Sequence, residues 1–376
     1  MGNARPFDRS DAVPLAPTAP PTANDRAPSR LLGLELLRFG AALSILFFHY
    51  NHFARAAGAA PIARADVPFY SALWPLYDYG QFGVQLFWGI SGYIFFWKYA
   101  EAIHARSVAA SRFFWLRFSR LYPLHIVTLL TVVALQAIHR RLAGFDFIYP
   151  AQDGSLFARQ IFLATDWAAP SPFSFNGPIW SISAEVAIYA AFFLLLRRLP
   201  ATAKLCAAVI AASLALQLAG LNWVSIACAG YFFAGGLAAL APRRLRPHAA
   251  TALVILLAGC AAAGVLGDRD KLPTILLMAV PCLLLFCSAD GAWLSRWQRS
   301  IEAAGNLTYS TYLLHFPLQL MLAIAVAGSG ISLPLTSPLF LAAYLGIVVA
   351  AGWLSYRLFE LPAQAWIRRR TIGDRV

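Results

Sequence analysis

Four ionisable side chains, Arg38, His49, Glu185 and His315, stand within stretches of sequence that are otherwise apolar enough to lie in a membrane. Inside a lipid bilayer such a group is costly unless it is paired or faces a cavity, so function is the default expectation. The alternative is a structural polar contact between helices. Four such residues in one chain favour a site.

The spacing of Arg38 and His49 places them on one face of a helix. Eleven residues at 100° each return to nearly the same direction, about 16 Å further along the axis. If this span runs outwards, His49 lies near its outer end. Glu185 falls in the outer half of a span that runs the other way, so we expect His49 and Glu185 to reach one depth. The pair would make a general base and its orienting partner.

His315 is the alternative base, although its leucine-rich and aromatic surroundings favour a structural hydrogen bond. Glu185 could also act as the base if burial raised its pKa. Four further polar residues sit near span ends, where they can reach water: Glu35, His52, His125 and His139. We expect His52 to face the membrane interface.

Basic residues dominate the opposite, inner half. Arg117 and Arg120 lie one turn apart if their stretch is helical, and Arg38 falls at a similar depth. Such a cluster suits a phosphorylated ligand that arrives from the cytoplasm. Anchoring to lipid headgroups is the alternative for Arg117 and Arg120.

The composition requires lipid around these residues. Of 376 residues, 60% are hydrophobic and 12% charged, and the mean hydropathy is +0.62. A soluble domain carries about 25% charged residues. The net charge of +13 is scattered between apolar runs, which favours cytoplasmic loops over a nucleic-acid surface. The histidines show no zinc spacing, so we expect no metal.

Ten apolar runs are long enough to predict an all-α, polytopic membrane bundle. They are residues 31–53, 79–99, 121–139, 179–196, 205–220, 223–241, 249–267, 273–288, 307–327 and 335–358. With both termini inside, 22 of the 30 basic residues lie on the inner side and seven on the outer, as the positive-inside rule favours. Residues 1–30, rich in proline and alanine, are predicted to be a disordered cytoplasmic tail.

Two connections stand out. We expect Ser107–Arg120, aromatic and basic, to lie at the headgroup boundary before a span that begins at Leu121. The outer connection Arg140–Pro178 is long for a simple turn, which is typical of a functional loop.

Six motifs in order resemble the acyltransferase family 3 of membrane O-acyltransferases, over residues 31–370. They are LLRFGAALSILFFHY with Arg38 and His49, GQFGVQLFWGISGYIFFW, FFWLRFSRLYPLH with Arg117 and Arg120, WSISAEVAIYAAFF with Trp180, Ser181, Glu185 and Tyr189, NLTYSTYLLHFPL with Ser310, Tyr312 and His315, and RLFELP.

The resemblance implies a multi-pass acyltransferase of the bacterial inner membrane. Its donor would be a cytoplasmic acyl-coenzyme A, usually acetyl-CoA, and its acceptor a hydroxyl of an exported or surface polysaccharide or a lipid-linked precursor. It also implies that His49 is catalytic, that Arg38 supports it and that Arg117 and Arg120 bind the donor. The other motif positions, Trp180, Ser181, Tyr189, Ser310, Tyr312 and His315, are expected to bind substrate.

Two other classes of protein remain as alternatives. A polysaccharide or lipid flippase would line its path with intramembrane charges, but the paired broken helices and internal symmetry of such transporters are not evident in the sequence. A scaffold subunit would not need an arginine and a histidine on one helical face. The sequence leaves the oligomeric state open.

Overall fold

The computed structural model of the chain describes residues 31–56, 62–167, 169–262, 270–288 and 292–373. The predicted tail, residues 1–30, lies outside them, and Leu32–Val376 form one compact unit. Within the described ranges all regular structure is helical, as predicted.

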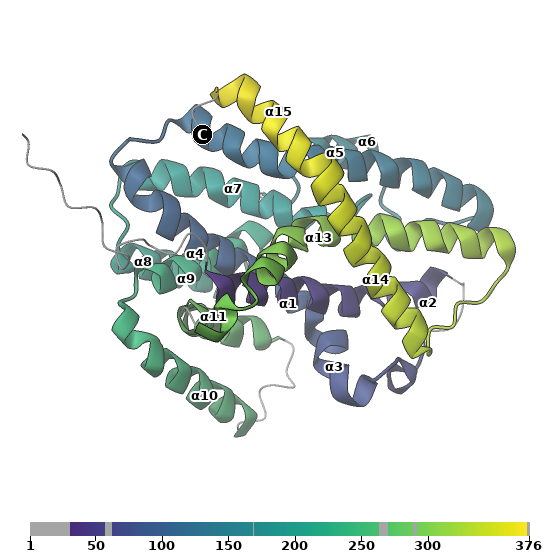
Figure 1. Cartoon of the computed structure of the whole chain (residues 1–376), viewed down its shortest axis with the longest axis horizontal. Coiled ribbons are helices and arrows are strands. Elements are labelled where there is room, and N and C mark those ends of the chain that lie inside the picture. Colours follow the sequence, from purple (N-terminus) through teal and green to yellow (C-terminus); the bar gives the residue numbers. More distant parts are fainter. Residues whose placement is uncertain (1–30, 57–61, 168, 263–269, 289–291, 374–376) are drawn as a thin grey trace, which may run out of the picture. The chain divides into compact units, whose positions relative to one another are not determined.

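Fifteen α-helices follow one another along the described chain (Figure 1). They are α1 (Leu32–His49), α2 (His52–Ala56), α3 (Tyr70–Tyr79), α4 (Gly83–His104), α5 (Ala110–Ala143), α6 (Gly154–Ile161), α7 (Ile179–Leu196), α8 (Ala203–Leu218), α9 (Val224–Leu240), α10 (Arg246–Ala262), α11 (Leu272–Cys287), α12 (Ala292–Ser295), α13 (Gln298–Ser329), α14 (Pro338–Ser355) and α15 (Leu361–Ile372). A π-helical turn, Tyr356–Glu360, joins α14 to α15 without a break.

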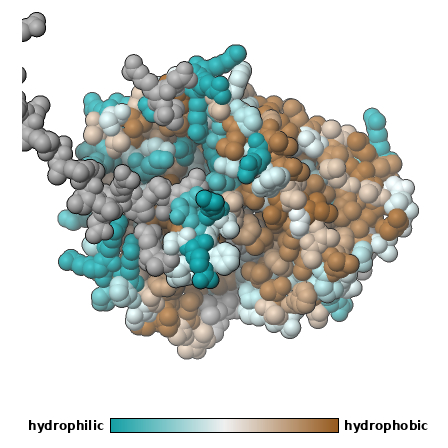
Figure 2. Space-filling model, viewed as in Figure 1, coloured by the Kyte–Doolittle hydropathy of each residue, from teal (hydrophilic) through white to brown (hydrophobic). Residues whose placement is uncertain are grey.

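Six helical stretches are long and apolar enough to cross a bilayer, and three shorter apolar helices, α8, α9 and α11, accompany them. Each of the ten predicted runs overlaps a helix, although residues 263–267 of the run 249–267 lie outside the described ranges. Helix α7 has the predicted bounds. Figure 2 shows apolar side chains over α14 and hydrophilic ones around the end of α15. A membrane bundle is therefore consistent with the structure, while ten crossings and two cytoplasmic termini stay predictions.

The predicted span 121–139 belongs to a longer helix, because Ala110–Ala143 form one helix that also contains the basic stretch before it. Its 34 residues extend for about 51 Å, well beyond the roughly 30 Å of a hydrocarbon core. Phe114, Phe118 and Tyr122 stack on each other at intervals of four residues across the predicted boundary. The helical repeat therefore continues through the basic stretch, and Arg117 and Arg120 are fixed on one rigid element.

The long outer connection folds back along α5. His139 bonds to the carbonyl of Phe145, and His125, 14 residues further inwards, bonds to the carbonyl of Gln160 at 2.8 Å. Both histidines are fully buried, so the expectation that they reach water near span ends is wrong. Irregular backbone at such depth is tolerated where protein surrounds it. The connection delivers the chain to Ile179, the start of α7, well inside the bundle.

This connection also holds strained backbone. Ile148, Leu163, Asp166 and Phe175 have φ between 42° and 63°, the left-handed region that side chains with a Cβ rarely adopt. Burial raises the pKa of the Asp166 carboxyl, which accepts a hydrogen bond from the amide of Ser171. Such strain persists only where surrounding structure enforces it, and it clusters at functional sites.

Glycines let α4 approach α9 closely. A Cβ at Gly235 would overlap the carbonyl oxygen of Gly89, and a Cβ at Gly92 would overlap that of Phe232. Small residues at such crossings bring membrane helices into backbone contact. The GISG run of α4 is thus a packing surface, and it fixes the wall that α4 gives to the site.

Candidate active site

Five helices, α1, α4, α5, α7 and α13, enclose a cavity of about 140 Å³. We call it the basic cavity. Seven of the eleven predicted site residues line it: Arg38, Arg117, Arg120, Ser181, Glu185, Tyr189 and Tyr312. Residues separated by more than 270 positions in the chain therefore share one space.

The three arginines of the cavity are held to different degrees. Arg117 donates to the Tyr99 hydroxyl at 2.7 Å, and its guanidinium lies 5.0 Å from the centroid of Phe95. Arg38 forms an ion pair with Glu35 at 3.2 Å. Arg120 has no hydrogen-bond partner among the described residues, and the Glu360 carboxyl is one of its charged neighbours.

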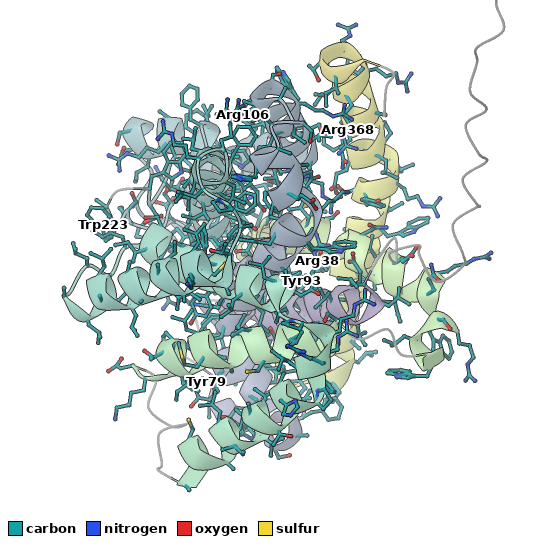
Figure 3. The ribbon with its side chains drawn as sticks, turned by 90° about the vertical axis from the view of Figure 1, so that its left-hand side faces the viewer. Arg38, Tyr79, Tyr93, Arg106, Trp223 and Arg368 are labelled. Atoms are coloured by element: carbon teal, nitrogen blue, oxygen red, sulfur yellow. The ribbon has the colours of Figure 1, made fainter. Side chains whose placement is uncertain are left out.

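Figure 3 labels three of the arginines. Arg106 and Arg368 lie near the upper end of the view, and Arg38 lies lower, towards the middle. Arg38, which lines the basic cavity, is therefore set in from these two arginines.

Glu185 belongs to the basic cavity and not to His49. Its carboxylate accepts a hydrogen bond from the Tyr189 hydroxyl at 2.6 Å, and Arg38 and Arg117 are its charged neighbours. No hydrogen bond joins it to His49 in the described structure, so the predicted pair is not formed.

The path of the long connection before α7, residues 140–178, explains why Glu185 does not reach His49. The Tyr312 hydroxyl donates to the carbonyl of Pro178 at 3.0 Å, so α7 begins beside the middle of α13. From there α7 carries Glu185 into the cavity that Arg38 also lines. The prediction placed the start of α7 at the outer surface.

The partner of His49 is His315. The two rings stack with centroids 4.9 Å apart, and His49 Nδ1 lies 3.1 Å from His315 Nε2. His315 Nδ1 lies 2.6 Å from the carbonyl oxygen of Tyr312, which can only accept, so Nδ1 carries the proton. A neutral His315 then accepts from His49 Nδ1–H, and His49 Nε2 keeps its lone pair.

His49 Nε2 is the ring nitrogen left unbonded. It has no hydrogen-bond partner among the described residues, and the His49 residue is only partly buried. A base with one nitrogen fixed and the other open is the arrangement that proton abstraction requires.

Three residues that sequence reasoning missed or misplaced complete this group. Gln319 donates to the carbonyl of His49 at 2.8 Å and to the Tyr344 hydroxyl at 3.1 Å. Its oxygen lies 3.1 Å from His52 Nδ1, and the centroid of the His52 ring lies 4.6 Å from that of His49, with the ring planes tilted by 38°. His52 therefore turns inwards, against expectation. We call His49, His52, His315, Gln319 and Tyr344 the histidine cluster.

Gln319 carried one signal in the sequence. It follows His315 by four residues in an otherwise apolar run, so the two share one face of a helix. Tyr344 carried none, because aromatic residues are common throughout the chain.

Tyr312 and Ser181 connect the two groups. The Ser181 and Tyr312 hydroxyls lie 2.7 Å apart, and each is also within hydrogen-bond distance of the carbonyl oxygen of Pro178. Whichever hydroxyl donates to the other, its partner can donate to that carbonyl. Tyr312 also lines the basic cavity, and its backbone carbonyl holds His315. The histidine cluster therefore begins one helical turn from the wall of the basic cavity.

Two predicted substrate-binding residues lie behind the cavity wall. Trp180 packs edge-on against Trp88 with centroids 5.8 Å apart, and Trp88 lines the cavity in its place. Ser310 is fully buried and bonds to the carboxylate of Glu360. Both residues therefore support the site from outside its lining.

A family profile described as an acyltransferase domain matches residues 31–357. The chain belongs to the acyltransferase family 3. Membership agrees with an all-helical architecture in which several helices are long and apolar enough to cross a membrane.

One curated relative is an acyltransferase called MdmB from Streptomyces mycarofaciens, 31% identical over 197 residues. The match covers 49% of this chain and 45% of MdmB, so the chain spans about half the length of that relative. No solved structure matches the chain.

Proposed function

We propose that this acyltransferase moves an acyl group, most simply acetyl, from cytoplasmic acyl-coenzyme A to a hydroxyl of a glycan. The acceptor would be an exported or surface polysaccharide, or its lipid-linked precursor, in the inner membrane of a bacterium. The observation that carries the proposal is the open Nε2 of His49 beside a cavity with three arginines.

The histidine cluster supplies the base. A sugar hydroxyl attacks a thioester slowly unless a base accepts its proton. His49 Nε2 would take that proton as the hydroxyl oxygen bonds to the carbonyl carbon, while His315 stabilises the imidazolium by accepting from Nδ1–H. The carbon–sulfur bond then breaks. The protonated His49 gives its proton to the departing sulfur, so coenzyme A leaves as the free thiol.

The basic cavity would hold the donor. Guanidinium groups bind phosphate oxygens through paired hydrogen bonds, and Arg120 has its donors free of described partners. Arg117 is already oriented by Tyr99, which limits the entropy it would lose on binding. Glu185 and Glu35 offset part of the positive charge when no donor is bound.

The test is transfer by the purified full-length protein in proteoliposomes. We expect release of the coenzyme A thiol from acetyl-CoA, and labelled acetyl on the glycan, when a glycan and glycolipid extract of the producing cells is supplied. His49→Gln, which keeps the shape of a polar side chain but cannot take up a proton, is the matched control. Glycan movement across the membrane without acetyl transfer would contradict the proposal and favour a flippase.

A further inference from the structure

A second hollow lies on the outside of α5, away from the basic cavity. It has a volume of about 880 Å³ and runs between α5 and the continuous helix Tyr356–Ile372. We call it the α5–α15 groove. Its lining is Phe118, Tyr122, Pro123, Leu358, Phe359, Pro362, Ala363, Trp366, Ile367, Arg369 and Arg370.

Apolar and aromatic side chains form the length of the groove. Phe118 and Tyr122 stack with ring centroids 4.5 Å apart on the α5 side. On the other side, Leu358 and Trp366 are 73% and 56% exposed in the protein alone. Large apolar side chains left this open face a partner that is itself apolar.

The groove has the length of one lipid leaflet. Leu358 and Arg370 are twelve residues apart on one helix, which is about 18 Å. Half of a bilayer's hydrocarbon core is about 15 Å. A single acyl chain could therefore lie along the groove from mid-membrane to the interface.

Positive charge is confined to one end of the groove. Arg369 and Arg370 line it there, in the last turn of α15, and both are exposed. The Arg370 guanidinium lies 4.4 Å from the centroid of Trp366, which fixes its plane and leaves its N–H edge open. Neither arginine forms an ion pair with a residue that the structure describes.

The neighbouring Arg368 turns the other way. It donates to the Ser119 hydroxyl of α5 at 3.0 Å and to the Gln364 amide oxygen at 3.1 Å. The bond to Ser119 ties α15 to the helix that carries Arg117 and Arg120. Of the three consecutive arginines, Arg368 therefore holds α5, and Arg369 and Arg370 face the groove.

We propose that the α5–α15 groove binds an anionic phospholipid, with the phosphodiester on Arg369 and Arg370 and one acyl chain along Trp366 and Phe118. The apolar length selects a lipid over a soluble phosphate. The two arginines select an anionic headgroup over a zwitterionic one, because each basic residue near an anionic surface contributes about 1 kcal/mol. The proposal does not depend on the identity of donor or acceptor.

The experiment is native mass spectrometry of the full-length protein, delipidated in detergent and titrated with phosphatidylglycerol or phosphatidylcholine of the same chains. We expect phosphatidylglycerol to bind at least about tenfold more tightly. The double variant Arg369→Ala/Arg370→Ala should lose that preference. Trp366→Ala should weaken both lipids, because it removes the apolar wall and the support of Arg370.

The matched control is Arg243→Ala/Arg244→Ala, another exposed arginine pair that does not line the α5–α15 groove. It should leave the preference for phosphatidylglycerol intact. Equal loss in the two double variants would mean that basic residues attract anionic lipid everywhere on this surface, and the proposal would fail. Equal affinity for both lipids in the unchanged protein would also overturn it.

Discussion

Two polar groups lie along the same helices, α1 and α13, and they are built in opposite ways. In the histidine cluster the polar contacts end on backbone carbonyls or neutral side chains, which fix the tautomer of each ring. In the basic cavity full charges face one another and Arg120 is left without a described hydrogen-bond partner.

This difference in hydrogen bonding suits proton transfer in the histidine cluster and donor binding in the basic cavity. Proton transfer needs one lone pair held in one direction, so the surrounding hydrogen bonds must be complete. Binding a phosphorylated donor needs unsatisfied donors, so the surrounding bonds must be incomplete. Variants of the histidine cluster should therefore lower kcat, and variants of the basic cavity should raise the KM for acyl-CoA.

The largest effect is expected for His49→Ala. Removing a general base lowers kcat by about 10²–10⁴-fold, and donor binding should be unchanged because the arginines remain. Steady-state kinetics and equilibrium binding of a non-hydrolysable acyl-CoA analogue separate these quantities. Substantial turnover by folded His49→Gln would show that His49 only positions substrate, and Glu185 or His315 would inherit the role of base.

His315→Phe should come next. It keeps the buried ring but removes the acceptor for His49 Nδ1–H, a bond to a group that becomes charged in the reaction. Such a bond contributes about 1.5–3 kcal/mol, so kcat should fall about 10- to 100-fold. The pH–rate profile should shift as well. A fall in kcat without a change in the profile would indicate that His315 serves packing alone.

Arg120 tests the other group. Arg120→Ala should raise the KM for acyl-CoA about tenfold or more and change kcat and the acceptor KM little. Arg120→Lys should restore only part of the loss, since an ammonium cannot make the paired contact. Equal losses towards both substrates would favour a role for the basic cavity in structure instead of donor binding.

A smaller effect is expected for Glu185→Gln. If Glu185 only balances the arginines, activity should stay within about fivefold of the unchanged protein, with no shift in the pH–rate profile. His315→Phe provides the comparison, since it should shift the profile. A shift of the pH–rate profile in Glu185→Gln would mean that Glu185 influences the proton transfer by His49. The histidine cluster and the basic cavity would then not be functionally separate.

Topology labelling should leave activity unchanged. In a chain whose natural cysteines have been replaced, Ser155→Cys and Gly328→Cys should react with an impermeant thiol reagent from outside. Ala239→Cys and Ile372→Cys should react only after the membrane is opened. Labelling of Ile372→Cys from outside would reverse the sides of the basic cavity and the histidine cluster.

The helices and the charged residues that line the basic cavity could be predicted from the sequence. Apolar runs of membrane length and the 3.6-residue repeat are local properties, so they identify α7 to the residue and place Arg38 and His49 on one face. The cost of charge in lipid then singled out Arg38 and Glu185, and a spacing of one helical turn singled out Arg117 and Arg120.

The partner of His49 was decided by tertiary structure. Whether Glu185 or His315 reaches it depends on the depth at which α7 begins, and that depth depends on how far the outer connection folds back along α5. Its bonds join residues far apart in the chain, such as Asn176 to Thr128 and Gln160 to His125. No local pattern encodes such distances, because loop residues carry no repeat that records where the chain returns.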